Sequence, residues 1–192
     1  MKRNGNFIFV FGCVLIVAGL TALFLLQVYT KKVEEKNTEI IQLIEGILID
    51  RREGIKDLER ESEMPALEIQ GEDFIALMEI PAYGLKLPVY KTWDKGKVLS
   101  YPCRFHGSVY NGTLIVGGFD QPGQFDFFDR IQNGAIVSVT DMTGMIFSYV
   151  VQQVERSGSA QSEVLMKGKW DLTLFVRDSQ SLEYIFLRCV EK

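Results

Sequence analysis

The chain contains little cysteine, which forms disulfides in many extracellular domains, and little histidine, which often takes part in catalysis. It has three cysteines and one histidine among 192 residues. Small secreted domains held together by disulfides contain far more cysteine, which argues against a disulfide scaffold. Basic residues number 21 against 25 acidic ones, and they form no clustered patch. This excludes the usual nucleic-acid-binding surface, and no nucleic-acid partner is expected.

Charge is absent from Asn4 to Thr30, and Phe7 to Val28 form a nearly continuous apolar run of 22 residues. A helix of that length can cross a bilayer core of roughly 30 Å. We therefore predict a cytoplasmic N-terminus over 1–6 and a transmembrane helix over 7–28. The alternative is a cleavable signal peptide, whose apolar region is shorter, about 7–15 residues. Gln27 to Thr30 is also a poor cleavage site for a signal peptidase.

Lys2 and Arg3 precede the apolar run and favour an N-terminus inside the cell. Lys31 and Lys32 on the far side weaken this contrast, although acidic residues follow at once. The expected location is the cell membrane, with a single pass and an extracytoplasmic C-terminal domain.

Residues 29–71 are expected to form a helical juxtamembrane stalk or linker, which Pro65 would end. The spacing of three or four between apolar residues is helical: these are Val33, Ile40, Ile44, Ile47, Leu48, Ile55 and Leu58. Three interpretations stay open, namely a solvated stalk, a helix packed on the following domain, and a short coiled-coil dimerisation segment. The sequence does not determine the oligomeric state.

Residues 72–192 contain short strand-like runs separated by turns, which is typical of an all-β barrel. Examples are Phe74 to Ile80 and Leu85 to Tyr90. Ile136 to Thr140 and Met145 to Val154 predict a hairpin around Gly144. No internal repeat is visible.

Two late segments carry a family resemblance, Trp170-Asp-Leu-Thr-Leu-Phe-Val-Arg177 and Tyr184-Ile-Phe-Leu-Arg-Cys189. Together they resemble the active-site hairpin of sortases, the membrane-anchored cysteine transpeptidases that attach proteins to Gram-positive cell walls. An Ile-Pro turn at Pro81, a Leu-Pro-Val-Tyr strand ending at Tyr90, and Thr113-Leu-Ile-Val-Gly-Gly118 extend the match. The resemblance covers about residues 73–191 and implies a sortase-like closed, mostly antiparallel barrel with short helices.

The same resemblance implies that the catalytic positions are empty. Sortases use a cysteine at the end of the first strand of that hairpin, and here Arg177 stands there. Their histidine follows a Val-Ile-Ala-Gly strand, at the position of Gly118. Their arginine opens the next strand, at Tyr184, or at Glu183 if the loop shifts by one residue. No thiolate, imidazole or oxyanion-stabilising arginine remains.

Cys103 and His106 could form a relocated catalytic pair. However, a spacing of three residues in an extended loop does not naturally bring a thiol and an imidazole within hydrogen-bond reach. A disulfide between Cys103 and Cys189 is the alternative to two buried thiols. Asp120, Asp126 and Asp129 lack the ligand spacing of a calcium loop, so no metal and no cofactor is expected.

Arg177 has two interpretations. It either forms an ion pair with Asp178, Glu183 or another carboxylate, or binds a ligand carboxylate with its planar guanidinium at the bottom of a peptide groove. Arg177, Glu183 and Tyr184 are the candidate groove residues. The expected protein is thus a catalytically inactive, membrane-anchored sortase-fold module, whose partner is an active sortase or a sorting-signal peptide of the cell wall. The alternatives are an active transpeptidase centred on Cys103 and His106, and a structural envelope protein without a ligand.

Overall fold

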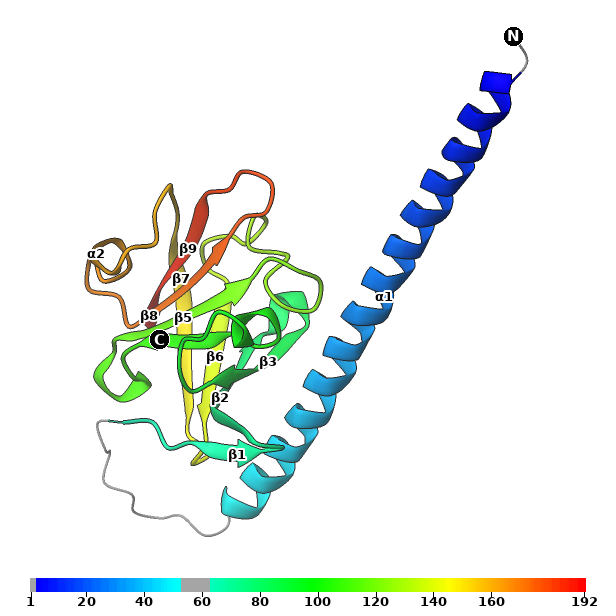
Figure 1. Cartoon of the computed structure of the whole chain (residues 1–192). Helices are drawn as coiled ribbons and strands as arrows, with labels where there is room; N and C mark the ends of the chain where they lie inside the picture. Colours follow the sequence, from blue (N-terminus) through cyan, green and yellow to red (C-terminus); the bar gives the residue numbers. More distant parts are fainter. Residues whose placement is uncertain (1–2, 53–62) are drawn as a thin grey trace. The chain divides into compact units, whose positions relative to one another are not determined.

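The computed structural model describes residues 3–52 and 63–192. Two compact units are distinguished, residues 1–36 and residues 37–192. The long helix α1, Arg3–Arg52, belongs to both units, and all strands belong to the second (Figure 1).

The first unit consists of the apolar half of α1. Its large apolar side chains are exposed, with Phe24 64 % and Leu25 66 % accessible. Among the described residues, one helical segment, Phe9–Leu48, is long and apolar enough to span a membrane. Its most apolar 18-residue window has a mean hydropathy of 2.7 and is unburied. Length and composition thus allow a membrane anchor.

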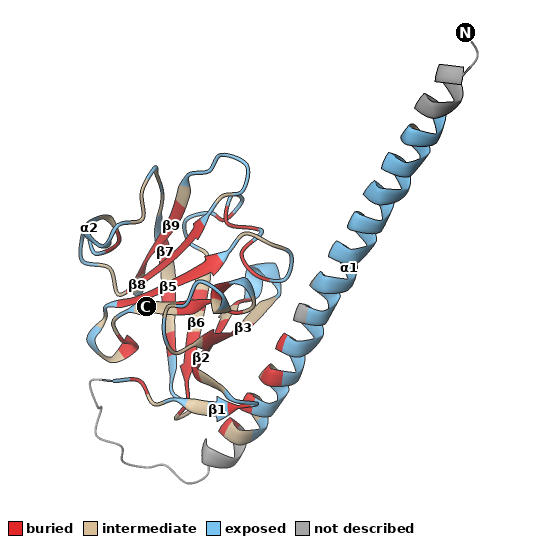
Figure 2. Ribbon diagram, in the orientation of Figure 1, coloured by how far each residue is buried: buried red, intermediate tan, exposed pale blue. Residues whose placement is uncertain are grey.

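The last turns of α1 pack on the barrel domain. Ile40, Ile44 and Leu48 are buried in one apolar cluster with Phe74 and Tyr101 (Figure 2). Their spacing of four residues puts them on one stripe of the helix. The part of α1 from Ile40 to Leu48 is therefore packed on the domain, whereas the described side chains just before Asn37 are exposed. The predicted helical positions Ile55 and Leu58 lie outside the described residues.

The domain is built on one sheet of nine strands in the described part of the chain. The strands are β1 (Leu67–Ile69), β2 (Glu72–Ile80), β3 (Leu85–Tyr90), β4 (Cys103–His106), β5 (Leu114–Phe119), β6 (Ile136–Asp141), β7 (Ile146–Ser157), β8 (Leu172–Arg177) and β9 (Tyr184–Glu191). The helix α2 (Ser162–Leu165) and 3₁₀ turns η1 (Pro81–Tyr83), η2 (Lys97–Leu99) and η3 (Val109–Asn111) complete it.

The strand order is β1-β2-β3-β4-β5-β8-β9-β7-β6. A further pairing of β6 with β2 closes the sheet into a barrel, with β1 added outside the ring. The pairs β3–β4 and β5–β8 are parallel, and the others are antiparallel. The predicted closed, mostly antiparallel barrel is confirmed.

Strand β8 shows why the hydrophobic runs near the end of the chain are continuous. Alternate side chains of a strand point to opposite faces. Leu172, Leu174 and Val176 lie in the barrel core, whereas Phe175 lies in a smaller outer cluster with Leu165 of α2. The strand is buried on both faces, as parallel strands usually are.

The predicted hairpin around Gly144 is confirmed. Strands β6 and β7 are antiparallel, and Gly144 has φ +88, a left-handed conformation that glycine adopts without a steric cost. The Asp141 carboxylate accepts hydrogen bonds from the backbone N–H groups of Thr143 and Met145, at 2.8 and 2.9 Å. The turn is thereby fixed by its own side chain.

Candidate functional site

Gly118, Arg177 and Tyr184 lie at one end of three neighbouring strands. Arg177, the last residue of β8, pairs with Phe119 of β5 on one side and Tyr184 of β9 on the other. One residue earlier on both strands, Gly118 of β5 pairs with Val176 of β8. Because adjacent strands lie about 4.8 Å apart, the register brings these positions together.

The three positions line one pocket of about 290 Å³, here called the Arg177 pocket. Its lining is mostly apolar and aromatic: Trp93, Val98, Phe105, Gly118, Phe119, Ala160, Phe175, Arg177 and Tyr184. Arg177 is the single charged side chain among the described residues of this lining. Glu183 does not line the pocket, so of the predicted groove residues the structure brings together Arg177 and Tyr184.

Aromatic rings form the wall of the Arg177 pocket. Trp93 stacks on Phe175 with ring centroids 5.5 Å apart, and Phe105 meets both rings edge-on at 5.8 Å. The Trp93 ring lies directly over backbone, since a Cβ at Gly117 would be 2.4 Å from its Cζ3 atom. The sequence analysis did not identify these aromatic residues. The adjacent glycines Gly117 and Gly118 are the one feature of the sequence that points to such packing, because glycine allows a side chain to lie directly on the backbone.

Gly118 has no room for a side chain. A Cβ there would lie 2.2 Å from Cδ2 of Phe125 and 2.9 Å from Oε1 of Gln124. The Gln124 side chain is itself fixed, because it accepts from the Phe119 N–H and donates to the Val98 carbonyl at 3.2 Å. Any side chain at position 118 would therefore clash with Phe125 and Gln124.

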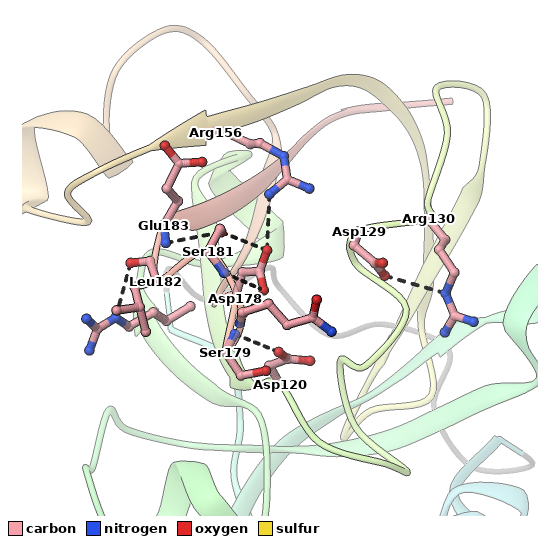
Figure 3. A network of polar contacts seen from close by, with 11 residues as sticks. Asp120, Asp129, Arg130, Arg156, Asp178, Ser179, Ser181, Leu182 and Glu183 are labelled. Atoms are coloured by element: carbon pink, nitrogen blue, oxygen red, sulfur yellow. Dashed lines mark hydrogen bonds and ion pairs between the residues drawn. The ribbon is translucent and has the colours of Figure 1, made fainter.

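Arg177 is exposed, and its Nε donates to the Leu182 carbonyl at 3.3 Å. Among the described residues it forms no ion pair. The ion pair with Asp178 or Glu183, one of the two interpretations of Arg177, is not formed. Asp178 instead pairs with Nη1 of Arg156, at 3.2 Å (Figure 3). The terminal nitrogens of Arg177 are left for another acceptor.

Asp178 fixes the turn between β8 and β9 (Figure 3). Its carboxylate accepts from the Gln180 N–H at 2.9 Å and from the Ser181 hydroxyl at 2.8 Å. These hydrogen bonds, with the Arg156 pair, lower the pKa of Asp178 to about 2.

A second contact fixes the same turn from outside. The Asp120 carboxylate, just after β5, accepts from the Ser179 N–H at 2.8 Å. Leu182 has φ +61, a conformation that is uncommon for a non-glycine residue. The turn holds the Leu182 carbonyl against Arg177 in this conformation.

The relocated pair is not assembled. Cys103 is buried, its thiol donates to the Tyr101 carbonyl at 3.4 Å, and burial raises its pKa to about 11. His106 is exposed, and no hydrogen bond joins it to Cys103 in the described residues. Neither residue lines the Arg177 pocket. A reactive cysteine needs the opposite, a lowered pKa.

The remaining candidates are structural. Cys189 is buried with its pKa raised by burial to about 12, and both it and Cys103 are free thiols, so no disulfide joins them. Asp120, Asp126 and Asp129 line one hollow, yet the described residues contain no group of three metal-ligating side chains.

A sortase-domain model matches residues 78–177, and the chain belongs to the sortase family. No relative is found among curated proteins.

Solved structures of similar fold include sortase C-3 from Streptococcus pneumoniae, with a TM-score of 0.56 and 16 % identity over 81 % of this chain and 84 % of that one. A Clostridium perfringens sortase D5 transpeptidase matches with TM-score 0.56 and 18 % identity, over 84 % of this chain and 99 % of that one. Sortase A from Corynebacterium diphtheriae has TM-score 0.56 and 15 % identity, over 83 % and 90 %. At these identities the likeness concerns the fold.

Proposed function

We propose that this protein is a membrane-anchored, extracytoplasmic sortase-fold module that binds a peptide chain and does not cleave it. The observation that carries the proposal is Arg177. It opens onto an aromatic pocket and has no ion-pair partner among the described residues. The sortase resemblance aligns its position with the family's nucleophile.

The geometry of Arg177 suits a carboxylate ligand. The Leu182 carbonyl occupies Nε, so the two terminal nitrogens are available to meet both oxygens of a carboxylate. Aromatic walls of Trp93, Phe105 and Phe175 exclude water from one side of the pocket. A lower local dielectric strengthens the attraction between opposite charges. The ligand we infer is a peptide that ends in, or carries, an acidic group.

The same residues argue against catalysis. Arginine stays protonated at any physiological pH and cannot act as nucleophile or base. A base at position 118 would have to displace Phe125. An active centre at Cys103 would need a thiolate, and the raised pKa of that thiol opposes it.

The apolar half of α1 would hold the module in the cell membrane, with the N-terminus inside. Its partner would be an active sortase or a cell-wall peptide of the sorting-signal type, approached from outside the membrane. An acidic chain end on either partner would satisfy Arg177.

The test uses the full chain in detergent micelles with a sorting-signal peptide and with its acidic derivative. Mass spectrometry should detect no cleavage and no thioester, while calorimetry should detect binding of the acidic peptide. A thioester that disappears in Cys103→Ala would establish the relocated transpeptidase instead. Absence of binding by every peptide would favour a structural envelope protein.

A further inference from the structure

One further hollow adjoins the Arg177 pocket, and a second hollow adjoins the first. The first, the Arg104 hollow, measures about 330 Å³ and shares Phe105 with the Arg177 pocket. The second, the Trp170 hollow, also measures about 330 Å³ and shares His106 and Thr113 with the Arg104 hollow. Shared side chains make the three neighbours, so they form one track across the surface of β4, β5 and β8.

The Arg104 hollow is lined by cationic and neutral polar groups. Nε of Arg104 donates to the Lys91 carbonyl at 2.9 Å, which fixes the side chain and leaves its terminal nitrogens for a ligand. Lys91 is partly neutralised, because its Nζ lies 3.5 Å from the Asp73 carboxylate. Glu63 is the acidic residue in this lining. Four neutral polar residues also line this hollow: Thr92, Ser108, Asn111 and Thr113.

The Trp170 hollow is lined by the Trp170 indole ring and by two lysine side chains. Lys167 and Lys169 line it and are exposed, and neither forms an ion pair among the described residues. The acidic residue here, Asp171, is already used, because its carboxylate accepts from the Glu191 N–H at 2.7 Å.

Taken together, the described residues that line the two hollows carry a net positive charge, whereas the whole chain carries a net negative charge. Among the described residues that line the two hollows, four are cationic (Lys91, Arg104, Lys167 and Lys169) and two are acidic (Glu63 and Asp171), a local balance of +2. The whole chain carries −4. A cationic track on an acidic protein attracts anionic ligands selectively to that track.

We propose that the Arg177 pocket is one end of this track, and that the ligand is an extended peptide with a second acidic group beyond its first. The proposal rests on the function proposed above. The chain end would sit on Arg177, and the peptide would pass Phe105 and place a second carboxylate at Arg104. Neutral polar side chains in the Arg104 hollow suit the amides of a peptide backbone.

The strand register gives the required length. Arg177 pairs with Phe119 of β5, and Arg104 of β4 pairs with Val116, three residues earlier on the same strand. Three residues along a strand and two strand spacings across it correspond to roughly 14 Å, at about 3.3 Å per residue and 4.8 Å per strand. The two acidic groups should therefore be about four residues apart in an extended peptide.

The test is calorimetry of the full chain in detergent micelles with three peptides that share one free carboxylate end. One has three residues, one has ten residues with Glu four positions before the end, and one has Gln in place of that Glu. The long acidic peptide should bind at least tenfold more tightly than the other two. Arg104→Ala should abolish this advantage, and Lys167→Ala combined with Lys169→Ala should reduce it. Arg130→Ala removes an exposed arginine that lines none of the three hollows and should change nothing.

The outcomes separate this inference from the function on which it rests. Equal affinities for the short and long peptides, all still dependent on Arg177, would overturn the track and leave the proposed function standing. Binding of no peptide would overturn both. Preference for an inorganic polyphosphate of similar length over the long acidic peptide would overturn the assignment to a peptide.

Discussion

The ring of Phe125 packs so closely on Gly118 that a Cβ at that glycine would lie 2.2 Å from its Cδ2 atom. Gly118 is the position that the sortase resemblance aligns with the family's histidine. A histidine there would have to displace the Phe125 ring.

Gly118→Ala should destabilise the domain by about 1–3 kcal/mol, the usual cost of forcing extra volume into a packed core. Urea unfolding of the two proteins measures the difference. Gly158→Ala is the matched control, because nothing lies within 4 Å of a Cβ there, and it should change stability by less than about 0.5 kcal/mol. Equal stability of Gly118→Ala and wild type would contradict the packing described.

Arg177→Cys should yield a protein that still does not transpeptidate. It would supply a thiol but no base, and Gly118→His could supply a base only by displacing Phe125. Mass spectrometry with a sorting-signal peptide should show no turnover for the single or the double variant. Turnover by Arg177→Cys alone would mean that another group activates the thiol, and our account of the site would be wrong.

The sequence predicted the hairpin of β8 and β9 well, because strand register depends on local patterns of apolar and turn residues. It also predicted that Gly118, Arg177 and Tyr184 lie together, because the resemblance to a known family implies which strands are neighbours and how they are aligned. It did not predict Phe125 over Gly118 or Trp93 over Gly117. Those contacts join segments whose proximity depends on how the barrel closes, and side-chain packing of that kind has no periodic signal.

The packing of α1 and the environment of Arg177 were also only partly predicted. Helical spacing predicted that Ile40, Ile44 and Leu48 lie on one face of a helix. It did not predict whether that face contacts solvent, a second chain or the barrel. The sequence put Asp178 beside Arg177 and left open whether they pair. In the structure the Asp178 carboxylate accepts from a backbone N–H group of the turn and pairs with Arg156 of β7.

Asp178 should contribute stability that depends on pH. Its folded-state pKa of about 2 lies below the value of about 3.9 for an unfolded aspartate. The contribution is therefore complete above about pH 4 and is lost as the pH falls toward 2. The stability difference between wild type and Asp178→Asn should narrow over that interval.

NMR titration of the Asp178 carboxyl tests the cause. Ser181→Ala removes one of the hydrogen bonds to the carboxylate and should raise its pKa. An Asp178 pKa near 4 in the wild-type protein would contradict the turn structure.

The membrane orientation can be tested in intact cells whose wall has been removed. Added protease should digest the domain that follows Lys31, because Lys2 and Arg3 favour an N-terminus inside. Permeabilised cells serve as the control for protease access to the cytoplasm. Full protection in intact cells, with digestion after permeabilisation, would place the domain in the cytoplasm.

The central claim is that Arg177 binds a carboxylate. Calorimetry of wild type and Arg177→Ala, each with a peptide ending in a free carboxylate and with its amidated form, tests it most directly. Wild type should prefer the free carboxylate, and Arg177→Ala should lose about 1.5–3 kcal/mol with that peptide alone, the range for a hydrogen bond to a charged group. Equal affinities in all four combinations would remove Arg177 from the function.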